Sequence, residues 1–532
     1  MLTESETQER LEGKRRAVVR PYVATAVALA LLGGTILRFS GLTSPPYDNH
    51  NFRQCQTLST IESFYREGID LLHPKTLCTG YPGTVALELP VFQALAASLY
   101  HLFGPHLEVI RLLNILFGAA TTWVLYRTVA YLLHDSSTAI AAAIIYWLAP
   151  LNILFQRSML IDPMAVFCGL VSFYSLALFL RVSSASETIS ARNNDLLCFG
   201  ILIVSTWLTA MLKALYLWPV VLLFGCAIWL RRFRIDRSLV ISSAVFLLCG
   251  ASLLVWNHHT AAINRTNPLI PGWRLTALLG FSGLFSPDFY IRMLRSAPRW
   301  WLGAAFILYP VGLWACWLKR SDSRTATILA LLVLIPPTYL AAFANINKPH
   351  EYYQLIVTPF LSIVAACGAL WLMATPWFAA RLMRSQTSIV GLSAFFVLAA
   401  VGVYSIWLRW PALDHRIEKF GELCNGRFPP WSASILFVDS KTDGYAPVPF
   451  VPAYQYAGKL WGWGMTVTNV SSTSVLLGEL APTMSRLDLV VFYGTDFPTW
   501  LPQDKFHLSL KDDEHHLYAF STASSGTTIP AR

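Results

Sequence analysis

Charged residues are scarce in this chain of 532 residues. Asp, Glu, Lys and Arg make up only 13% of it, whereas apolar residues make up 55%, and the mean hydropathy is +0.49. This balance excludes a soluble globular protein. Zinc-type and CxxC cysteine spacings are missing as well. The chain has instead a series of apolar runs of roughly 20 residues, the length that a helix needs to cross a bilayer.

Most of the nine cysteines lie inside apolar runs, where packing is the ordinary role of a thiol. Cys55 and Cys78 are different because they share the first loop. A disulfide between them is one alternative if that loop faces an oxidising compartment. The sequence does not establish the geometry that such a bond needs.

The net charge of +10 does not indicate nucleic-acid binding. The basic residues cluster in short loops between apolar runs, which is the positive-inside pattern that sets membrane topology. The first run, residues 21–39, follows a basic stretch, and no small-residue cleavage site lies behind it. We therefore expect residues 1–20 to be a cytoplasmic basic tail and the first run to be a retained span rather than a signal peptide.

Hydropathy and the basic loops predict about eleven spans in a transmembrane domain of residues 21–409. The first outer loop covers residues 40–106. The spans that bear most on the site are expected at residues 107–133, 138–155, 163–180 and 325–343, with a further pair that turns near Lys213.

One apolar segment of the first outer loop, residues 87–103, is ambiguous because it is short and contains Glu88 and Gln93. If it crossed the membrane, every later loop would change side. The basic cluster at residues 231–237 would then face outward, against the positive-inside rule. We therefore expect an amphipathic helix that lies on the outer membrane surface.

Residues 410–532 differ in character from the rest of the chain. Hydropathy falls, and β-rich runs appear at residues 434–438 and 487–493. Two further runs, 506–510 and 517–520, flank a polar stretch and predict a hairpin. The segment is long enough for one small α/β domain, which the predicted topology places outside the membrane.

A polar cluster follows the first span directly, with an acid, an imidazole, a guanidinium and an amide at Asp48, His50, Arg53 and Gln54. Such groups at a membrane boundary are costly unless they do chemistry or find partners. The predicted topology puts the other unusual polar residues on the same side: Glu88, Arg157, Asp162, Lys213, His350, Tyr352 and Tyr353. This arrangement suits transfer from a lipid-borne donor, because basic groups can hold an anionic headgroup and a carboxylate can accept a proton from a hydroxyl.

The order of these residues resembles the integral-membrane glycosyltransferases of the GT-C fold. The resemblance is to the bacterial branch grouped with protein O-mannosyltransferases and with the enzyme that adds aminoarabinose to lipid A. It covers residues 20–375 and rests on order and membrane side rather than on one specific motif. The matching residues are Asp48 to Gln54, Thr57, Glu88 to Pro90, Phe103, Gly104, Arg111, Arg157, Asp162, Lys213, His350, Tyr352 and Tyr353.

The resemblance implies catalytic roles for two acids. Asp48 would activate the acceptor hydroxyl, and Asp162 would be a second acid near the site. Some relatives carry paired acids after the first span, whereas Asn49 follows Asp48 here. We therefore assign no metal ligand and no certain cofactor, and a divalent metal stays open.

The resemblance also implies a substrate-binding set. Lys213 and Arg53 would contact the donor phosphate, with Tyr352 or Tyr353 nearby. The remaining expected members of the set are His50, Gln54, Glu88, Arg157 and His350.

Several of these residues have a structural alternative. Asp48 could cap a helix, Glu88 could be a carboxylate at a helix N-terminus, and Lys213 could extend to the membrane interface. Arg157 and Asp162 could form an ion pair with each other at a helix end.

The predicted function is transfer of a sugar, with inversion, from a polyprenyl-phosphate-linked donor to a hydroxyl of a lipid, glycan or protein. The predicted place is the outer face of the bacterial inner membrane, among membrane lipids. One alternative is a polymerase or ligase of lipid-linked glycans. Another is a lipid-linked sugar flippase or transporter, which would place polar groups at mid-bilayer in repeated halves; here they collect at one boundary.

Overall fold

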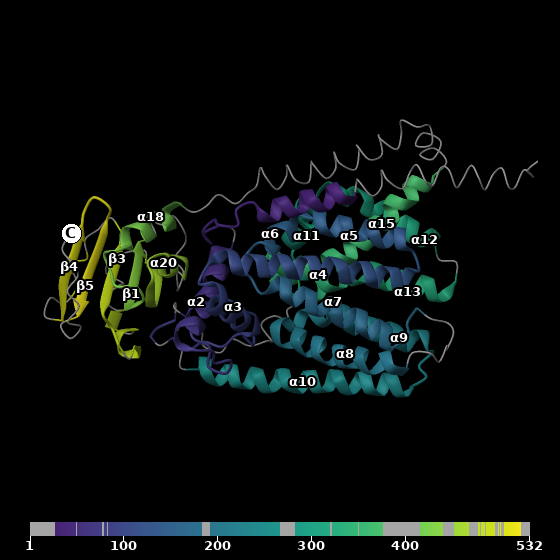
Figure 1. The fold of residues 1–532 in the computed structure, drawn as a ribbon, viewed down its shortest axis with the longest axis horizontal. Coiled ribbons are helices and arrows are strands. Elements are labelled where there is room, and N and C mark those ends of the chain that lie inside the picture. Colours follow the sequence, from purple (N-terminus) through teal and green to yellow (C-terminus); the bar gives the residue numbers. More distant parts are fainter. Residues whose placement is uncertain are drawn as a thin grey trace, which may run out of the picture.

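The computed structural model describes residues 27–48, 50–76, 79–81, 83–183, 192–265, 282–319, 322–348, 350–375, 415–439 and 452–467, and parts of 477–522. Figure 1 shows an elongated bundle of helices with a small α/β domain at one of its ends. The predicted domain boundary at residue 410 and the spans expected after residue 375 lie outside the described residues.

The first half of the bundle begins with the helix Val27–Phe39. It continues with α2 (Asn51–Glu67), α3 (Val91–Phe103), α4 (Leu107–Leu133), α5 (Ser136–Leu148), α6 (Pro150–Gln156), α7 (Asp162–Phe179), α8 (Arg192–Lys213), η1 (Ala214–Leu217) and α9 (Trp218–Leu230). The second half contains α10 (Arg237–Asn264), η3 (Ser282–Phe285), α11 (Pro287–Ser296), η4 (Ala297–Trp301), η5 (Gly303–Ile307), α12 (Leu308–Leu318), α13 (Ser323–Ala342), α14 (Ala344–Asn347), η6 (Glu351–Val357) and α15 (Thr358–Ala374).

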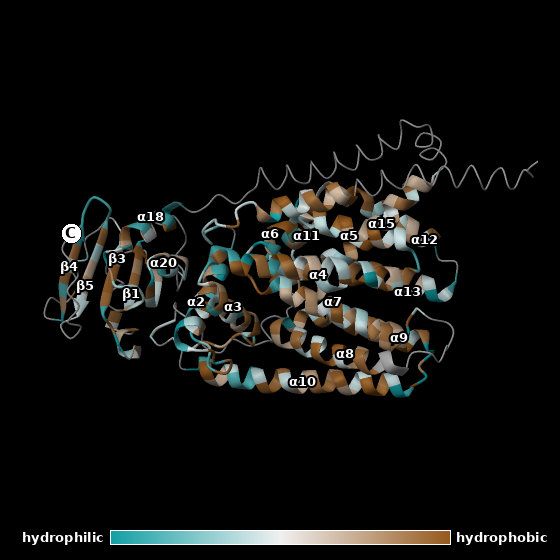
Figure 2. Ribbon diagram, in the orientation of Figure 1, coloured by the Kyte–Doolittle hydropathy of each residue, from teal (hydrophilic) through white to brown (hydrophobic). Residues whose placement is uncertain are grey.

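Six segments of the described chain are long and apolar enough to cross a bilayer: Leu107–Leu133, Asp162–Phe179, Leu196–Leu230, Arg237–Asn264, Ser323–Ala342 and Glu351–Ala374. The bent pair α5 and α6 makes a seventh if it counts as one span. Figure 2 shows hydrophobic residues along the length of these helices and hydrophilic ones toward their ends. The chain is thus a polytopic α-helical membrane protein, and the number of about eleven spans stays a prediction.

The segment Leu196–Leu230 reverses direction in its middle, as the sequence predicts. Lys213 lies 2.5 Å from Asp162 at the start of α7. Arg231, just after the segment, donates to the carbonyl of Leu180, just after the end of α7, over 2.7 Å. α8 and α9 therefore run in opposite directions along α7.

These contacts define two ends of the bundle. The site end holds the start of α7 and the end of α8, and the backbone after the first helix joins it, because Arg111 of α4 donates to Gly41 at 2.6 Å. The opposite end holds the basic loops, where Lys319 lies 3.7 Å from Asp135. The polar residues singled out in the sequence therefore share one end, as the predicted topology requires.

The helix α3 lies across the site end instead of passing through the bundle. Before its start, Leu89 donates its backbone N–H to Met211 of α8 at 3.1 Å. Near its end, the ring of His101 lies 4.8 Å from Tyr65 of α2. Both ends of α3 thus contact elements of the site end, which agrees with the surface helix expected for this segment.

The span predicted at residues 138–155 is bent rather than straight. α5 and α6 meet at an angle of 59° because Pro150 cannot donate to the preceding turn. The side-chain amide of Asn152 donates instead to the carbonyl of Tyr146 at 2.7 Å, and Thr358 of α15 donates to Asn152 at 2.8 Å. The bend carries the end of α6, and with it Arg157, into the site.

The C-terminal domain has a five-stranded sheet of order β2-β1-β3-β5-β4. Its elements are α18 (His415–Cys424), β1 (Ser432–Asp439), α20 (Pro452–Ala457), β2 (Leu460–Val467), η7 (Ala481–Thr483), β3 (Leu489–Tyr493), β4 (Phe506–Asp512) and β5 (Leu517–Thr522). β1 pairs in parallel with β2 and β3. β4 and β5 form the predicted antiparallel hairpin, so this prediction is confirmed.

Candidate active site

Asp48 lies in the short connection between the first helix and α2. Its carboxylate accepts a hydrogen bond from the Gln54 side-chain amide at 2.5 Å and lies 3.8 Å from the Arg157 guanidinium. His50, in the left-handed region with φ 56°, is the N-cap residue of α2, and this cap has no side-chain hydrogen bond. The alternative that Asp48 caps a helix is therefore wrong.

Gln54 joins Asp48 to the turn between α6 and α7. Its amide oxygen accepts from the backbone N–H of Met159 at 3.1 Å, while its amide nitrogen donates to Asp48. Asn114 of α4 holds the same turn through the carbonyls of Ser158 and Leu160, at 2.7 and 2.8 Å. Gln54 thus orients the Asp48 carboxylate. The sequence predicted a substrate-binding role for Gln54 and not this orienting role.

The surroundings of Asp48 favour a carboxylate that can take up a proton. Burial raises the pKa of Asp48 above its usual value, although the charges of Arg157 and Arg111 and the Gln54 hydrogen bond act in the opposite direction. A base works best when its pKa lies closer to the working pH. The side chain keeps 14% exposure, so an incoming hydroxyl has access to it.

Asp162 pairs with Lys213 over 2.5 Å, and both side chains are buried. Tyr216 places its hydroxyl 2.8 Å from the same carboxylate oxygen, while the second oxygen has no hydrogen-bond partner among the described residues. The Lys213 ammonium also lies 3.8 Å from the centre of the Tyr353 ring and 4.6 Å from that of Tyr352.

This geometry corrects two expectations. Arg157 faces Asp48 rather than Asp162, so the ion pair expected as an alternative at the helix end does not form. Lys213 does not extend to the interface, because its side chain is only 5% exposed. It is held inward by a carboxylate and two aromatic rings.

Arg53 and Glu88 form a second ion pair, between α2 and the segment that precedes α3. Arg53 also donates to the side-chain oxygen of Gln56 at 2.6 Å. The N-cap residue of α3 is Pro90, without a side-chain cap. Glu88 is therefore a partner of Arg53, and it stands before the N-cap of α3, whose first turn holds no acidic residue.

His50 meets the η6 segment from the other side of the site. Its Nε2 lies 2.9 Å from the Glu351 carboxylate, and its ring packs edge-on against Tyr352 at 4.9 Å. The ring of His350 lies 5.3 Å from that of Tyr352, and burial, followed by the charges of His50 and Lys213, lowers the pKa of His350 to about 4.

The predicted site residues form three groups at the site end: Asp48 with Gln54 and Arg157, Arg53 with Glu88, and Lys213 with Asp162, Tyr352 and Tyr353, to which His50 and His350 are joined through Tyr352. Tyr216 and Glu351 belong to this region although they were not predicted as site residues. Glu351 stands between two predicted positions in the sequence, which was the available signal, whereas nothing in the local sequence distinguishes Tyr216. Among the described residues, no three His, Cys, Asp or Glu side chains group to hold a metal ion.

Two small cavities meet at Glu88. One, of about 20 Å³, is lined by polar side chains that include Arg53, Gln56 and Gln93. The other, of about 60 Å³, is lined by Lys213 and Tyr353 together with residues of α8 and α10. Both cavities are small, so the site is narrow. Leu87 and Glu88 line both and stand between the polar cavity and the cavity beside the Lys213 ammonium.

An apolar groove adjoins the Lys213 cavity. It has a volume of about 540 Å³ and is lined by residues of α8, η1, α9 and α10. Ala210 and Leu253 line both the groove and the cavity. The apolar groove and the cavity beside the Lys213 ammonium thus lie next to each other, with Ala210 and Leu253 between them.

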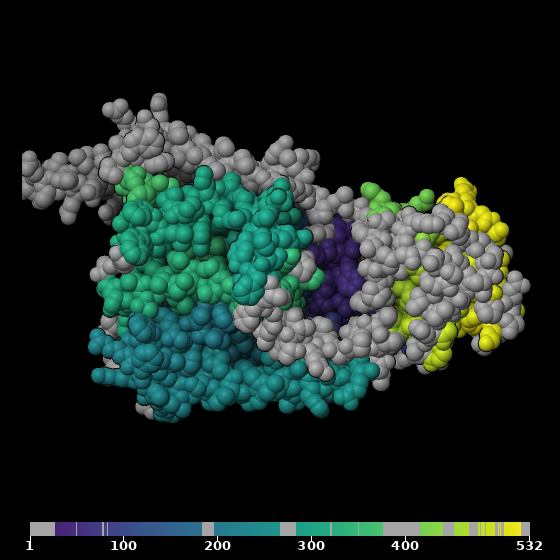
Figure 3. Space-filling model, turned by 180° about the vertical axis from the view of Figure 1, so that it is seen from behind, coloured from purple at the N-terminus to yellow at the C-terminus, as the bar shows by residue number. Residues whose placement is uncertain are grey.

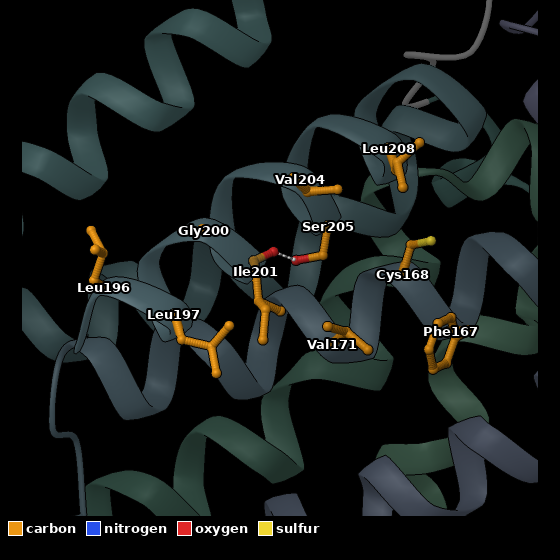
Figure 4. Close-up of a pocket in the computed structure, with 10 residues that line it drawn as sticks. All are labelled: Phe167, Cys168, Val171, Leu196, Leu197, Gly200, Ile201, Val204, Ser205 and Leu208. Atoms are coloured by element: carbon orange, nitrogen blue, oxygen red, sulfur yellow. Dashed lines mark hydrogen bonds between the residues drawn. The ribbon is translucent and has the colours of Figure 1, made fainter. Parts of the chain in front are cut away.

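A larger apolar pocket, of about 750 Å³, lies elsewhere, between α7 and α8. Figure 4 shows its lining side chains, including Leu196, Leu197 and Val204 of α8, and the hydrogen bond of Ser205 to the Ile201 carbonyl. No charged residue lines it. Exposed leucines of this kind suit contact with acyl chains.

Comparisons with known proteins agree with this picture. Residues 99–277 match the sequence profile of the dolichyl-phosphate-mannose-protein mannosyltransferase family. A comparison with curated protein sequences gave no match.

Solved structures of membrane glycosyltransferases share the fold. ArnT from Cupriavidus metallidurans, bound to undecaprenyl phosphate, superposes with a TM-score of 0.61 at 12% identity, over 95% of this chain and 99% of its own. The oligosaccharyltransferase AglB from Archaeoglobus fulgidus, in complex with an inhibitory peptide and a dolichol-phosphate, gives 0.56 at 12% identity, over 88% and 69%. Arabinofuranosyltransferase AftD from Mycobacteria gives 0.52 at 15% identity, over 94% and 41%.

The superposition on ArnT covers nearly the whole of both chains, so it includes the helical bundle and the C-terminal domain. The profile match covers the segment from the end of α3 to beyond α10, which contains Arg157, Asp162 and Lys213. The chain therefore has the GT-C fold of these structures, and residues 99–277 are similar to the mannosyltransferase family.

Proposed function

We propose that the protein transfers a sugar from a polyprenyl-phosphate-linked donor to a hydroxyl of an acceptor at the outer face of the bacterial inner membrane. The observation that carries the proposal is the apolar groove that adjoins the cavity beside Lys213. A polyprenyl chain is apolar and its phosphate is anionic, so the groove and the cation match the two parts of one molecule. The ArnT and AglB structures hold undecaprenyl phosphate and dolichol-phosphate, which supports the same donor class.

Two cations would hold the donor phosphate. Lys213 and Arg53 each have a carboxylate partner in Asp162 and Glu88. The donor phosphate is a diester with one negative charge, and the polyprenyl phosphate that leaves is a monoester with up to two, so the two cations would stabilise the charge that develops as the sugar departs. A guanidinium can bind the phosphate through two parallel hydrogen bonds, and Glu88, which lines both cavities, would be the carboxylate displaced.

Asp48 would act as the general base in a single displacement. The acceptor oxygen attacks the anomeric carbon while the bond from that carbon to the phosphate oxygen breaks. The electron pair leaves with the polyprenyl phosphate, and the hydroxyl proton moves to the Asp48 carboxylate. Attack opposite to the leaving group inverts the anomeric centre. Asp162 is the poorer candidate for this proton because it is buried and paired with Lys213.

The test is a transfer assay with the purified full-length protein in lipid nanodiscs. The donors are radiolabelled undecaprenyl-phosphate sugars, and the acceptors are membranes of a strain that lacks this protein. Label that moves from the donor to membrane glycans, with release of undecaprenyl phosphate, supports the proposal. Donor that crosses the bilayer of proteoliposomes unchanged, without transfer to membranes inside or outside, supports the flippase alternative and overturns the proposal.

Mass spectrometry of the product identifies the acceptor. A single added sugar on a lipid, glycan or protein agrees with the proposed transfer. A ladder of repeating units assigns the site to the polymerase alternative, which uses the same donor chemistry and differs only in the acceptor.

A further inference from the structure

The C-terminal domain shares a hydrophobic core with the segment that carries Asp48. Cys55 of α2 is fully buried in the same cluster as Ile417 and Phe420 of α18, and Tyr47 packs against that cluster. Burial raises the pKa of Tyr47, and nearby Cys55 and Glu418 add to the effect. The residue immediately before the proposed base thus lies against the C-terminal domain.

Other contacts attach the domain to the same loop farther from Asp48. Tyr81 packs against Trp461 of β2 with 5.1 Å between ring centres, and Gly80 donates its N–H to the Gly462 carbonyl at 3.0 Å. Figure 3 shows residues of this purple segment between the teal and green helices and the green and yellow domain. The first outer loop therefore lies between the helical bundle and the C-terminal domain. Its contacts through Gly80 and Tyr81 are far along the chain from Asp48, whereas the contact through Tyr47 adjoins Asp48.

The N-terminal part of α2 contacts both the helical bundle and the C-terminal domain. Gln54 points to the helical bundle, where it binds Asp48 and Met159. The next residue, Cys55, contributes to the C-terminal core, and its thiol lies 3.7 Å from the Pro46 carbonyl. Asp48 lies in the chain between Tyr47, which contacts the C-terminal domain, and Gln54, which contacts the helical bundle. The N-cap of α2 has no side-chain hydrogen bond that would fix this segment.

We propose that the C-terminal domain positions the catalytic carboxylate, with Tyr47 and Cys55 as the positioning residues. This inference rests on the proposed function, in which Asp48 is the base. A base must lie within hydrogen-bond reach of the proton that it takes, and a misplacement of about 1 Å can cost on the order of 100-fold in rate. Packing of Tyr47 against the domain holds the Asp48 backbone from one side, and the Gln54 amide holds its side chain from the other.

The test compares Tyr47→Ala with Tyr81→Ala in the full-length protein in nanodiscs. Both changes remove a tyrosine of the first outer loop from a contact with the C-terminal domain, but only Tyr47 adjoins Asp48. We expect Tyr47→Ala to lower kcat about 10- to 100-fold with little change in KM for the donor. Tyr81→Ala and the conservative Tyr47→Phe should keep kcat within about threefold of the parent. Tyr47→Leu gives an intermediate case if the alanine variant does not fold.

The pH profile separates positioning from mere stabilisation. Burial raises the pKa of Asp48, so loosening the Tyr47 packing should admit water and lower that pKa. The acid limb of kcat should then move to lower pH in Tyr47→Ala and stay in place in Tyr81→Ala. Equal loss of kcat in both variants without a shift of the limb would overturn the proposal, as would an unchanged kcat in Tyr47→Ala.

Two readouts do not depend on turnover. Binding of undecaprenyl phosphate should be equal in all variants, and amide hydrogen exchange at the start of α2 should be faster only in Tyr47→Ala. If the parent transfers no sugar, the proposed function fails, while the exchange measurement still decides whether the domain holds this segment. Slow exchange in Tyr47→Ala would show that it does not.

Discussion

Lys213 and Asp162 form an ion pair of 2.5 Å inside the helical bundle, with Asp162 wholly buried. Their positions lie 51 residues apart in the chain, at the end of α8 and the start of α7. Removing one partner of such a pair leaves the other charge buried and uncompensated, whereas replacing both can be nearly neutral. This relationship gives Asp162 a structural role as the partner of a buried cation, with Lys213 and Tyr216 on the same carboxylate oxygen.

The ion pair predicts different outcomes for single and double substitutions. Lys213→Met alone should destabilise the protein by about 3–5 kcal/mol because it strands the Asp162 carboxylate. The double variant Asp162→Asn with Lys213→Met should recover most of that stability and still bind undecaprenyl phosphate poorly. Thermal unfolding and a lipid-binding titration measure the two effects. Parental donor affinity in the stable double variant would place the phosphate elsewhere.

The pairing of Arg157 with Asp48 predicts a shift in the pH dependence of transfer. Burial raises the pKa of Asp48, and the Arg157 charge lowers it in part. Arg157→Gln removes the lowering influence, so the pKa should rise further and the acid limb of kcat should move to higher pH. The pH–rate profile of the purified variant measures this. A limb that moves to lower pH, or not at all, would mean that another group titrates.

Membrane topology follows from the placement of the site residues at one end of the bundle. A reporter fused after Arg234 should be cytoplasmic, and one fused after Lys511 should be extracytoplasmic, because the basic loops lie at the opposite end from Asp48. Paired phosphatase and fluorescent-protein fusions make the measurement. If Arg234 were found outside, the site would face the cytoplasm, and a donor on the outer leaflet could not reach it.

Much of this arrangement could be predicted from local patterns. The apolar run at residues 107–133 coincides with α4, and the two runs at residues 506–510 and 517–520 that flank a polar stretch predicted the β4–β5 hairpin. Both patterns depend on neighbours in sequence. The choice of a surface helix at residues 87–103 depended on charge balance between loops, and the contacts of α3 agree with it.

The ion pairs could not be predicted, because they depend on how distant elements pack. The bend at Pro150 turns Arg157 toward Asp48, and the reversal after Lys213 brings that ammonium to Asp162. Local sequence presents Arg157 and Asp162 as neighbours, which is why their pairing was a reasonable alternative. The packing of Tyr47 against the core that contains α18 could not be predicted from sequence patterns either, since the two segments lie hundreds of residues apart in the chain.

The central claim is that Asp48 takes the proton of the acceptor hydroxyl. Asp48→Asn keeps the size of the side chain and can still meet Gln54, but the amide cannot accept a proton. Transfer should therefore fall by about 10²–10⁴-fold, while the affinity for undecaprenyl phosphate and the thermal stability stay close to those of the parent.

The most direct measurement is the single-turnover rate of sugar transfer by purified Asp48→Asn, made beside its undecaprenyl phosphate affinity, with Asp162→Asn as the matched control. We expect a rate lower by about 10²–10⁴-fold with parental lipid affinity for Asp48→Asn, and a smaller loss, accompanied by lower stability, for Asp162→Asn. Near-parental turnover in Asp48→Asn would remove this carboxylate from the mechanism.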